Sequence, residues 1–449
     1  MGEVIEATAL DPDGCGVGQL GQGGEVRIAD LLPGERAEIA IDHRSRHRSV
    51  AWGHITRRIS PPSAHRCPPA CPAFGACGGC VWQHWAYPAQ LEGKRDRLQR
   101  ALDSAGLRVP VAPTVPSPRI IGYRNAAKYV IAGAPGKVIL GAFRPRTHEV
   151  VSTVGCRVVD PAIDAAATFA KTVLDETPLA IYDEGSRRGH LRYLVIRAGM
   201  AADVVLTVVT TPDAPRRTVE NLAASSIGRA GITGVAWMKN AATSGRITSA
   251  DITPLSGTIE TREQVAGATL AIAPDAFFQV NRDQALAIYD AIAASLGAGA
   301  GTRAVDVFSG AGGIALAVAA RGAEVVGIER NANAVAAAQR AADDAGLPAR
   351  FVCGDAATLA TVAERVAPAA VMVNPPRKGL MPATLAALVK VAPARIAYMS
   401  CGPESLARDA AALSESGYRL DTVVPYDFLP GTAWVEALAM FEMSRARSI

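Results

Sequence analysis

The sequence is poor in aromatic residues and has no long apolar run. Phe, Trp and Tyr together make up 5% of the 449 residues, and no charge-free apolar stretch is long enough to span a bilayer. The first residues, MGEVIEATALDPDG, lack the basic region and apolar core of a signal peptide. Hydrophobic residues make up 49% and charged residues 20%, which is an ordinary globular composition. We therefore expect a cytoplasmic, monomeric protein of roughly two to four domains, without a membrane segment.

A large excess of one charge is also absent, since the formal net charge is only +4. The distribution of charge is more informative than the total. Residues 43–66 contain six Arg, four His and no acidic residue. The runs Arg44–Arg48 and Arg57-Arg58 could supply phosphate contacts to a nucleic acid. A solvated charged face is the alternative interpretation of the same residues.

Short β-like runs separated by glycine turns fill the first 60 residues. The turns are Asp11–Gly14, Gly21–Gly24 and Leu32–Glu35. This pattern predicts a small β-barrel over residues 1–60, and barrels of the oligonucleotide-binding type hold RNA. Residues 60–66, which include Pro61-Pro62, then read as a linker.

Four cysteines predict a metal cluster in the next part of the chain. Cys71, Cys77 and Cys80 lie close together, and Cys156 follows downstream. In a reducing compartment such a cluster of thiols indicates metal binding rather than disulfides. Three close cysteines and one remote cysteine fit a [4Fe–4S] cluster better than the paired knuckles of zinc sites. Cys67 is a possible fifth ligand, and unliganded thiols are the alternative.

Residues 61–265 otherwise predict an α+β central domain. A helix is expected over residues 85–105, and β-rich runs recur at 128–132, 191–197, 204–210 and 234–238. From residue 266 to 449 the pattern changes to strands that alternate with helices. The expected strands are 304–308, 324–329, 350–353, 370–374 and 396–400. This alternation predicts a parallel, doubly wound sheet, that is, an α/β Rossmann-like domain.

A glycine-rich loop follows the first of these strands. Ser309-Gly310-Ala311-Gly312-Gly313 allows a ligand to approach the backbone closely. Glu329 ends the next strand, 23 residues after Asp306, where an acid binds ribose hydroxyls. The spacing is not the G-x-G-x-x-G of a dinucleotide site, and Asp306 beside the loop suits a cationic amino-acid tail. We therefore favour S-adenosylmethionine over NAD.

Two further strand ends carry polar residues for which the sequence leaves alternatives open. Asp355 could recognise an adenine amino group or could simply cap a helix. Asn374-Pro375-Pro376 forms a stiff turn that could be a wall beside the cofactor or an ordinary end of a strand. The same Asn-Pro-Pro run occurs in enzymes that methylate exocyclic amines, but there an aromatic residue follows, and here Arg377 follows.

Cys401 ends the last predicted parallel strand, where Gly402-Pro403 stops the apolar run. Ligands of open α/β sheets lie at the carboxyl ends of the strands, so this thiol is a candidate nucleophile, although most free cysteines are small buried residues. A thiolate that adds to C6 of uracil makes C5 able to accept a methyl group. A base must then remove the C5 proton, and Glu436 is the best candidate. The alternative for Glu436 is an exposed acid on a strand.

Taken together, these motifs resemble the RNA uracil-C5 methyltransferase family, specifically the branch with an N-terminal TRAM barrel and an iron–sulfur cluster. The resemblance covers nearly the whole chain, including Gly122–Asn125, Gln279–Asn281 and Ser400–Pro403. It implies Cys401 as the nucleophile and Glu436 as the proton-abstracting carboxylate. It implies a cluster held by Cys71, Cys77, Cys80 and Cys156. It also implies S-adenosylmethionine contacts from Gln279, Phe308, Gly313, Glu329, Asp355 and Asn374.

The sequence departs from the family pattern near the expected site. The family usually has Asp at Asn374, Cys at Ser309, Asn at Gly313 and Gly402, and His at Trp434. Because Cys401 and Glu436 are both present, we expect an active enzyme that methylates uridine C5 in structured RNA. The TRAM and cluster domains favour ribosomal RNA, and transfer RNA is a possible substrate.

Two other functions are compatible with part of the sequence. The first is an RNA methyltransferase that acts on an exocyclic base amine through Asn374-Pro375-Pro376. The second is a non-catalytic RNA-binding iron–sulfur protein. Neither needs the thiol of Cys401, so that residue discriminates between them and uracil-C5 methylation.

Overall fold

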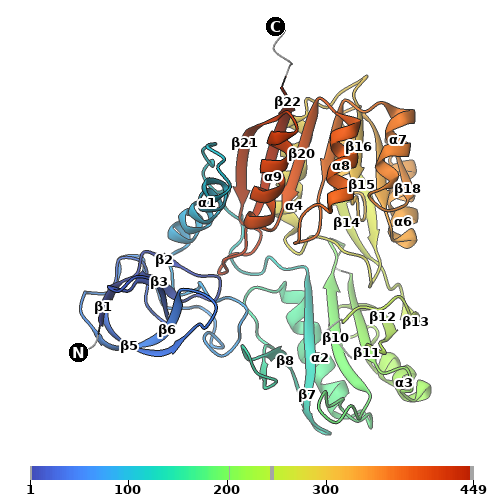
Figure 1. Cartoon of the computed structure of the whole chain (residues 1–449). Helices are drawn as coiled ribbons and strands as arrows, with labels where there is room; N and C mark the ends of the chain where they lie inside the picture. Colours follow the sequence, from blue (N-terminus) through green and yellow to red (C-terminus); the bar gives the residue numbers. More distant parts are fainter. Residues whose placement is uncertain (1–2, 202, 243–246, 445–449) are drawn as a thin grey trace.

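The chain folds into an N-terminal β half-barrel, a central domain and a C-terminal Rossmann-type domain (Figure 1). The computed structural model describes residues 3–201, 203–242 and 247–444. No helix within these ranges has the length and apolar character that crossing a membrane requires.

The N-terminal sheet is a six-stranded half-barrel. Its strands are β1 (Glu3–Glu6), β2 (Ala9–Leu10), β3 (Gly16–Gln19), β4 (Glu25–Ile28), β5 (Arg36–Arg44) and β6 (Val50–Arg58). They lie in the order β1-β5-β6-β4-β3-β2. Alternate residues point inward, as in β4, where Val26 and Ile28 are fully buried and their neighbours are not.

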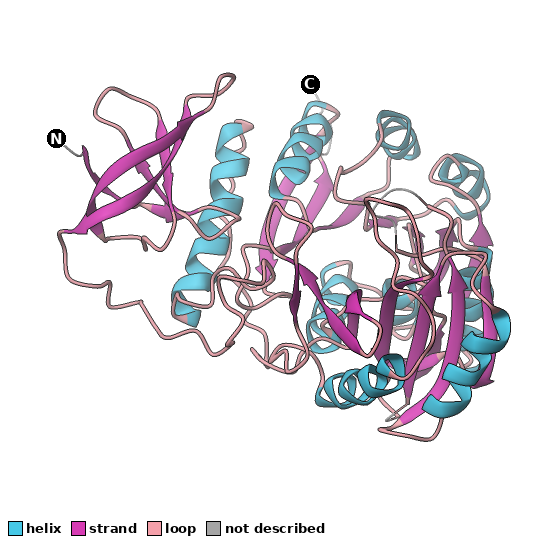
Figure 2. Cartoon of the chain, turned by 90° about the horizontal axis from the view of Figure 1, so that it is seen from below, coloured by secondary structure: helices cyan, strands magenta, loops and turns pink. Residues whose placement is uncertain are grey.

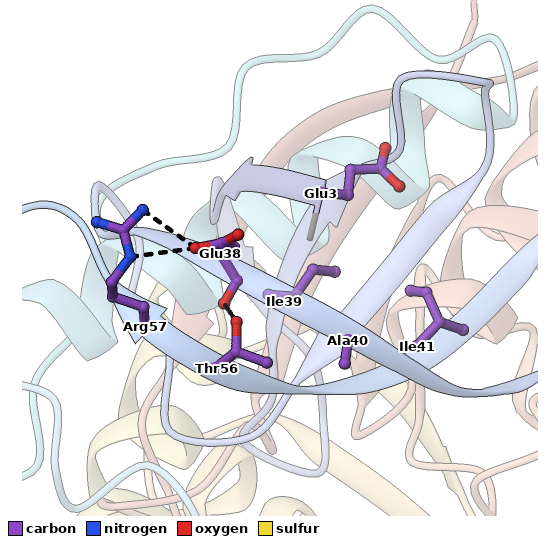
Figure 3. Close-up of a pocket in the computed structure, with 7 residues that line it drawn as sticks. All are labelled: Glu3, Glu38, Ile39, Ala40, Ile41, Thr56 and Arg57. Atoms are coloured by element: carbon purple, nitrogen blue, oxygen red, sulfur yellow. Dashed lines mark hydrogen bonds and ion pairs between the residues drawn. The ribbon is translucent and has the colours of Figure 1, made fainter. Parts of the chain in front are cut away.

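Several basic residues of this half-barrel are bound to its own acids. Arg57 pairs with Glu38 at 3.1 Å beside a surface pocket (Figure 3). Arg58 pairs with Glu35 and Asp30. Arg57 and Arg58 are therefore paired within the protein although both are exposed, and Arg44, Arg46 and Arg48 are exposed around the β5–β6 turn.

The segment predicted as a linker is anchored to the half-barrel. Arg66 donates to the buried carboxylate of Glu35 at 2.7 Å and pairs with Asp30 at 2.7 Å. The backbone N–H of Ser63 also donates to Glu35. Hydrogen bonds from Arg66 and from backbone amides outweigh the desolvation of Glu35 and lower its pKa to about 2. Proline content alone did not indicate this attachment.

The central domain is a seven-stranded sheet with two helices. The strands are β7 (Ala126–Ala134), β8 (Lys137–Phe143), β9 (Val150–Ser152), β10 (Leu191–Ala198), β11 (Val204–Thr210), β12 (Ile232–Lys239) and β13 (Ile252–Gly257). Helices α2 (Pro161–Asp175) and α3 (Arg216–Ser226) pack on it through a shared apolar core. The side chain of Asp160 caps α2 by accepting from the N–H of Ala162.

The C-terminal domain contains a second seven-stranded sheet, in the order β18-β17-β16-β19-β20-β22-β21. The first five strands are parallel, and β22 runs antiparallel to both β20 and β21. The strands are β16 (Arg303–Val307), β17 (Glu324–Glu329), β18 (Ala349–Cys353), β19 (Ala370–Val373), β20 (Arg395–Ser400), β21 (Tyr418–Tyr426) and β22 (Glu436–Met443).

Helices and one hairpin complete this domain. The helices are α4 (Arg282–Ser295), α5 (Gly313–Ala319), α6 (Ala332–Asp344), α7 (Thr358–Val366), α8 (Pro382–Val391) and α9 (Pro403–Glu415). The hairpin of β14 (Thr261–Val265) and β15 (Ala268–Ile272) packs into the same core as α4, α5 and α6. The predicted α/β architecture of this region is confirmed.

Helix α1 (Tyr87–Ser104) lies between the half-barrel and the rest of the molecule (Figure 2). It packs on the C-terminal domain, because the fully buried Leu98 and Leu102 join the core that contains Leu406 of α9 and Val423 of β21. A segment that follows the cysteine cluster in sequence thus belongs to the core of the C-terminal domain in space.

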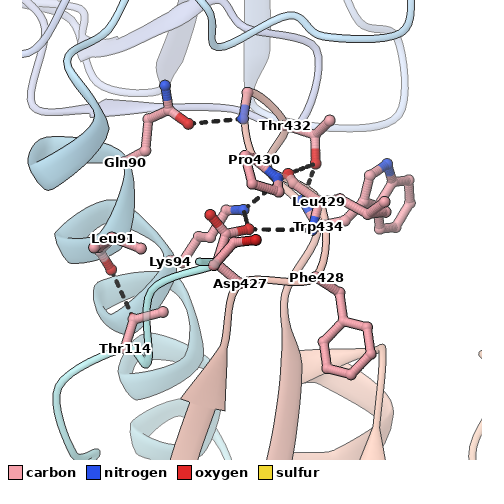
Figure 4. A network of polar contacts seen from close by, with 12 residues as sticks. Gln90, Leu91, Lys94, Thr114, Asp427, Phe428, Leu429, Pro430, Thr432 and Trp434 are labelled. Atoms are coloured by element: carbon pink, nitrogen blue, oxygen red, sulfur yellow. Dashed lines mark hydrogen bonds and ion pairs between the residues drawn. The ribbon is translucent and has the colours of Figure 1, made fainter. Parts of the chain in front are cut away.

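A buried ion pair fixes α1 to the chain that leads into β22. Lys94 and Asp427 are both fully buried, and the ammonium of Lys94 contacts the Asp427 carboxylate and donates to the carbonyl of Leu429 at 3.1 Å (Figure 4). Burial lowers the pKa of Lys94, and the Asp427 charge opposes this shift. A buried pair of this kind is favourable only while each charge is compensated by the other.

We predict that Lys94→Met destabilises the protein by about 3–5 kcal/mol, because Asp427 would be left as a buried, uncompensated charge. The measurement is the free energy of unfolding in urea. The control is Arg216→Met, which breaks the exposed Arg216–Glu220 pair of α3 and should cost at most about 0.5 kcal/mol. Equal losses in the two variants would contradict this account of the buried pair.

Candidate active site

The pairing of β20 with β22 brings the two predicted catalytic residues together. In this antiparallel ladder Ser400 lies opposite Ala437. The next residue of one strand, Cys401, therefore lies beside the preceding residue of the other, Glu436. Their charges interact, since the Glu436 carboxylate contributes to the pKa of Cys401. Residues 35 positions apart in sequence thus meet at one end of the sheet.

Burial raises the pKa of both groups. Desolvation raises the pKa of Cys401, and the charge of Glu436 raises it further. Desolvation also raises the pKa of Glu436, to about 8. The guanidinium of Arg377 lowers the pKa of both groups. Arg377 is therefore the cation that favours a thiolate and a carboxylate at this position.

Arg377 is the site residue that sequence reasoning missed. Its guanidinium lies 4.3 Å from the ring centroid of Trp434, which is a cation–π contact. From the sequence, Arg377 only weakened the exocyclic-amine interpretation, and Trp434 was only a departure from the family pattern. In the structure the two residues are in contact, and the Trp434 ring holds the guanidinium of Arg377 where it acts on Cys401 and Glu436.

The loop that carries Arg377 is bound to the helix that follows Cys401. Ser405 on α9 donates to the carbonyl of Arg377 at 3.1 Å, and Arg408 donates to that of Lys378 at 2.8 Å. The buried carboxylate of Asp409 accepts from the N–H of Leu380 at 2.7 Å. The loop and the turn at Cys401 therefore form one unit.

Two of the departures from the family pattern have a steric explanation. A Cβ added at Gly402 would lie 2.6 Å from Oγ of Ser405, and one added at Gly313 would lie 2.6 Å from the ring of Tyr289. Because atoms do not approach so closely, any side chain at either position would require Ser405 or Tyr289 to move. Glycine therefore fits at both positions because Ser405 and Tyr289 already occupy the space that a side chain would need.

The glycine loop lies where the strand order reverses. β16 pairs with β17 on one side and with β19 on the other, which makes the ends of β16 and β19 the switch point of the sheet. Phe308 has a positive φ of 66°, and the φ values of Gly310 and Gly312 are also positive, at 56° and 92°. A Cβ at Gly310 would meet nothing within 4 Å, and the buried Oγ of Ser309 has no hydrogen-bond partner. The loop thus offers open space and a free polar atom to a ligand.

The acids near this loop differ in their surroundings. Glu329 accepts from the N–H of Gly310 at 3.1 Å and of Asn331 at 2.8 Å, which fixes its carboxylate at the end of β17. Asp306 is fully buried, accepts from the N–H of Ala315 and has a pKa raised by burial to about 8. It therefore supports α5 rather than presenting a negative charge to a cationic tail. Asp355 is exposed and accepts from the N–H of Ala357.

Gln279 and Asn374 are each held by backbone hydrogen bonds. Gln279 is buried, and its carbonyl accepts from Nδ2 of Asn125 at 3.1 Å, so the Gly122–Asn125 motif holds this segment. The N–H of Asn374 points to the carbonyl of Val307 at 3.4 Å, beside the glycine loop. Phe277, two residues before Gln279, is 69% exposed.

The four predicted cluster cysteines also gather in space. Cys77 interacts electrostatically with Cys156 and Cys71, and Cys80 with Cys156 and Cys77. Desolvation is the main cause that raises the pKa of Cys77 and Cys80. Cys67 differs, because its thiol lies 3.4 Å from the carbonyl of Gln83. Across the described ranges no group of three or more His, Cys, Asp or Glu side chains is arranged to hold a metal ion.

Comparison with known proteins first defines the class of the C-terminal domain. Residues 304–391 match the family model "Methyltransferase domain". The whole chain is similar to an uncharacterized RNA methyltransferase of Parasynechococcus marenigrum, with 35% identity over 97% of this chain and 94% of that protein. An uncharacterized RNA methyltransferase of Geobacter sulfurreducens is 32% identical over 98% of this chain and 90% of its own length.

A solved structure narrows the class to one family. The tRNA (uracil-54, C5)-methyltransferase of Pyrococcus abyssi, in complex with S-adenosyl-L-homocysteine, superposes with a TM-score of 0.76. It is 28% identical and covers 98% of this chain and 100% of that chain. The protein belongs to the RNA uracil-C5 methyltransferase family, as the sequence motifs indicated. It is an S-adenosylmethionine-dependent RNA methyltransferase.

We predict that the rate rises with pH above neutrality and that Arg377→Gln moves this rise to higher pH. The base form of Glu436 gains as pH passes its pKa of about 8, and the thiolate of Cys401 gains likewise. Without the Arg377 cation both pKa values increase, so the displacement should be about one pH unit or more. The measurement is the pH profile of single-turnover methylation.

The control for this profile is Lys378→Gln, which changes the neighbouring exposed cation. It should leave the position of the pH profile unchanged. A profile that is the same in Arg377→Gln as in the native protein would show that Arg377 does not tune these groups.

Proposed function

We propose that the protein transfers a methyl group from S-adenosylmethionine to C5 of a uridine in structured RNA, through a covalent bond between Cys401 and uracil C6. The observation that carries this proposal is the register of β20 and β22, which sets a thiol beside a carboxyl group at the carboxyl end of the sheet. Methylation of an exocyclic amine needs no such pair.

The steps follow from the chemistry of these two groups. The Cys401 thiolate adds to C6, and the electrons of the C5–C6 double bond move to C5 and the adjoining carbonyl. C5 then takes the methyl group that the cofactor would supply when bound, and the bond between that methyl group and the sulfonium sulfur breaks. Glu436 as carboxylate removes the C5 proton, the C5–C6 double bond forms again, and the C6–S bond breaks to release the thiolate. Arg377 stabilises the anionic forms of both side chains.

The cofactor contacts are part of the proposal. Glu329 would bind the ribose hydroxyls with the lone pairs that Gly310 and Asn331 leave free. Phe308 and Gly313 would line the floor of the cofactor site. Gln279, Asp355 and Asn374 would line its sides. Asp355 is exposed enough to reach an adenine amino group despite its bond to Ala357. Failure to bind S-adenosylmethionine by calorimetry would favour the non-catalytic RNA-binding alternative.

The RNA contacts would come from the half-barrel and from Phe277, near the start of the methyltransferase domain. The half-barrel would act as a TRAM domain and contact phosphates through the exposed Arg44, Arg46 and Arg48, and Phe277 could stack on a base. We assign residues 1–60 to this domain, 61–265 to the central domain and 266–449 to the methyltransferase domain, with α1 and β14 of the middle range packed into the core of the last one. The solved relative acts on tRNA, whereas the barrel and the cysteine set favour ribosomal RNA. Mapping of 5-methyluridine in the RNA of a deletion strain would identify the substrate.

We predict that Cys401→Ala abolishes turnover and the covalent adduct with RNA that contains 5-fluorouridine. Glu436→Gln should instead accumulate an adduct on ordinary RNA, because it blocks removal of the C5 proton after methyl transfer. The measurement is a gel under denaturing conditions with labelled RNA. The control Cys353→Ala changes an exposed thiol at the end of β18 and should remain active. Turnover by Cys401→Ala would refute the mechanism.

The cysteine cluster is a separate proposal. Thiolates are the usual ligands of [4Fe–4S] clusters, and Cys71, Cys77, Cys80 and Cys156 would each bind one iron of such a cluster. We predict that anaerobically purified protein contains iron and sulfide and absorbs in the visible range, and that Cys80→Ser loses both. Cys67→Ser serves as the control and should retain them. Zinc without iron would refute the assignment.

A further inference from the structure

Groups from other parts of the chain hold most of the backbone carbonyls in the segment that precedes Glu436. We call residues 427–433 the base loop, because it leads through Trp434 to Glu436. Six of its seven carbonyls accept a hydrogen bond from another part of the chain. The donors, in the order of the carbonyls from Asp427 to Gly431 and then Ala433, are Gln284, Asn281, Lys94, Tyr123, the N–H of Trp82, and Arg97.

One face of α1 supplies three of the side chains that hold the base loop. Gln90, Lys94 and Arg97 follow one another at intervals of four and three residues, so they lie on the same face of the helix. Gln90 accepts from the N–H of Gly431 at 2.8 Å, and Lys94 donates to the carbonyl of Leu429 at 3.1 Å (Figure 4). Arg97 donates to the carbonyl of Ala433 at 3.0 Å.

Arg97 also reaches the helix that follows the nucleophile. Its other terminal nitrogen lies 3.2 Å from the carboxylate of Glu404, three residues after Cys401. Ala433 is three residues before Glu436. A single guanidinium thus contacts the segment of the nucleophile and the segment of the base. The Arg97 side chain is only 16% exposed, whereas Glu404 is 70% exposed, so the bond to Ala433 is the stronger constraint.

The cysteine segment contacts the same loop. Gln90 donates to the carbonyls of Trp82 and Trp85 while it accepts from Gly431. Gly431 has a φ of 79°, and a Cβ there would lie 3.5 Å from Cβ of Cys80. The segment that contains Cys80 therefore contacts the base loop directly.

We propose that the α1 face of Gln90, Lys94 and Arg97 positions the base, and that Arg97 is the residue that sets Glu436 relative to Cys401. Arg97 does not reach the reacting atoms, and it acts through the carbonyl of Ala433. The inference rests on the proposed function, since it assumes that Glu436 removes the C5 proton after Cys401 has added to the base.

The test separates positioning of the base from a general loss of structure. In Arg97→Met, turnover should fall roughly 10- to 100-fold, the effect of a misplaced catalytic group. The covalent adduct on ordinary RNA should increase at the same time, because attack by Cys401 and methyl transfer continue while proton removal is slow. The yield of adduct with 5-fluorouridine RNA should equal that of the native protein.

Two variants control this experiment. Arg95→Met removes an arginine of the same helix that donates to Val111 rather than to the base loop, and it should leave turnover and adduct unchanged. Arg97→Lys keeps a donor for Ala433 and should recover most of the turnover. Thermal unfolding of all three variants shows whether they are folded.

The outcomes distinguish this inference from the proposed function. If turnover and the 5-fluorouridine adduct of Arg97→Met fall together, or if neither changes, Arg97 does not position the base. If the native protein itself forms no adduct with 5-fluorouridine RNA, the proposed function fails, and the inference fails with it.

Discussion

The antiparallel pairing of β20 with β22 is the constraint on which the rest of the active site depends. The five parallel strands of the sheet bring their carboxyl ends, and the loops that follow them, to one edge. β22 reverses direction, so its amino end meets that edge and places Glu436 beside Cys401. A parallel strand in the same position would carry the residue that precedes it to the opposite edge. The register of β20 and β22 sets the positions of Cys401 and Glu436, and the surrounding loops add the contacts of Arg377 and Trp434.

The reaction needs Cys401 and Glu436 in their ionised forms, and burial of the site disfavours these forms unless a cation compensates for it. Burial raises the pKa of both Cys401 and Glu436, and the charge of Glu436 raises that of Cys401 further. Arg377 is the cation that opposes this effect, and its position depends on the ring of Trp434 and on the bonds from α9. The functional species is the thiolate first and the carboxylate later.

The strands of the C-terminal domain could be predicted from local pattern, because parallel buried strands are short continuous apolar runs. The expected strand 324–329 coincides with β17, and the run from Ile396 that ends before Gly402-Pro403 lies within β20 and its following turn. The half-barrel followed similarly from its glycine turns. Cys401 and Glu436 could be named because each occurs in a recognisable motif.

What the sequence could not indicate were contacts between distant segments. Arg377 and Trp434 are 57 positions apart, and nothing local to either one predicts a cation–π contact. The same is true of Lys94 and Asp427, whose pairing attaches α1 to the catalytic domain. The steric reason for Gly313 is Tyr289 on another helix. Residues 60–66 were predicted as a linker because Pro and Ser are typical of linkers, whereas the ion pairs of Arg66 with Glu35 and Asp30 depend on the folded barrel.

The most direct test of the central claim follows the hydrogen at C5 of the target uridine. RNA that carries tritium at C5 of its uridines would be methylated with S-adenosylmethionine, and the tritium released to water would be compared with the methyl groups transferred. Attack by Cys401 with proton removal by Glu436 predicts one tritium released for each methyl group. Methyl transfer with tritium retained in the RNA would contradict methylation at C5.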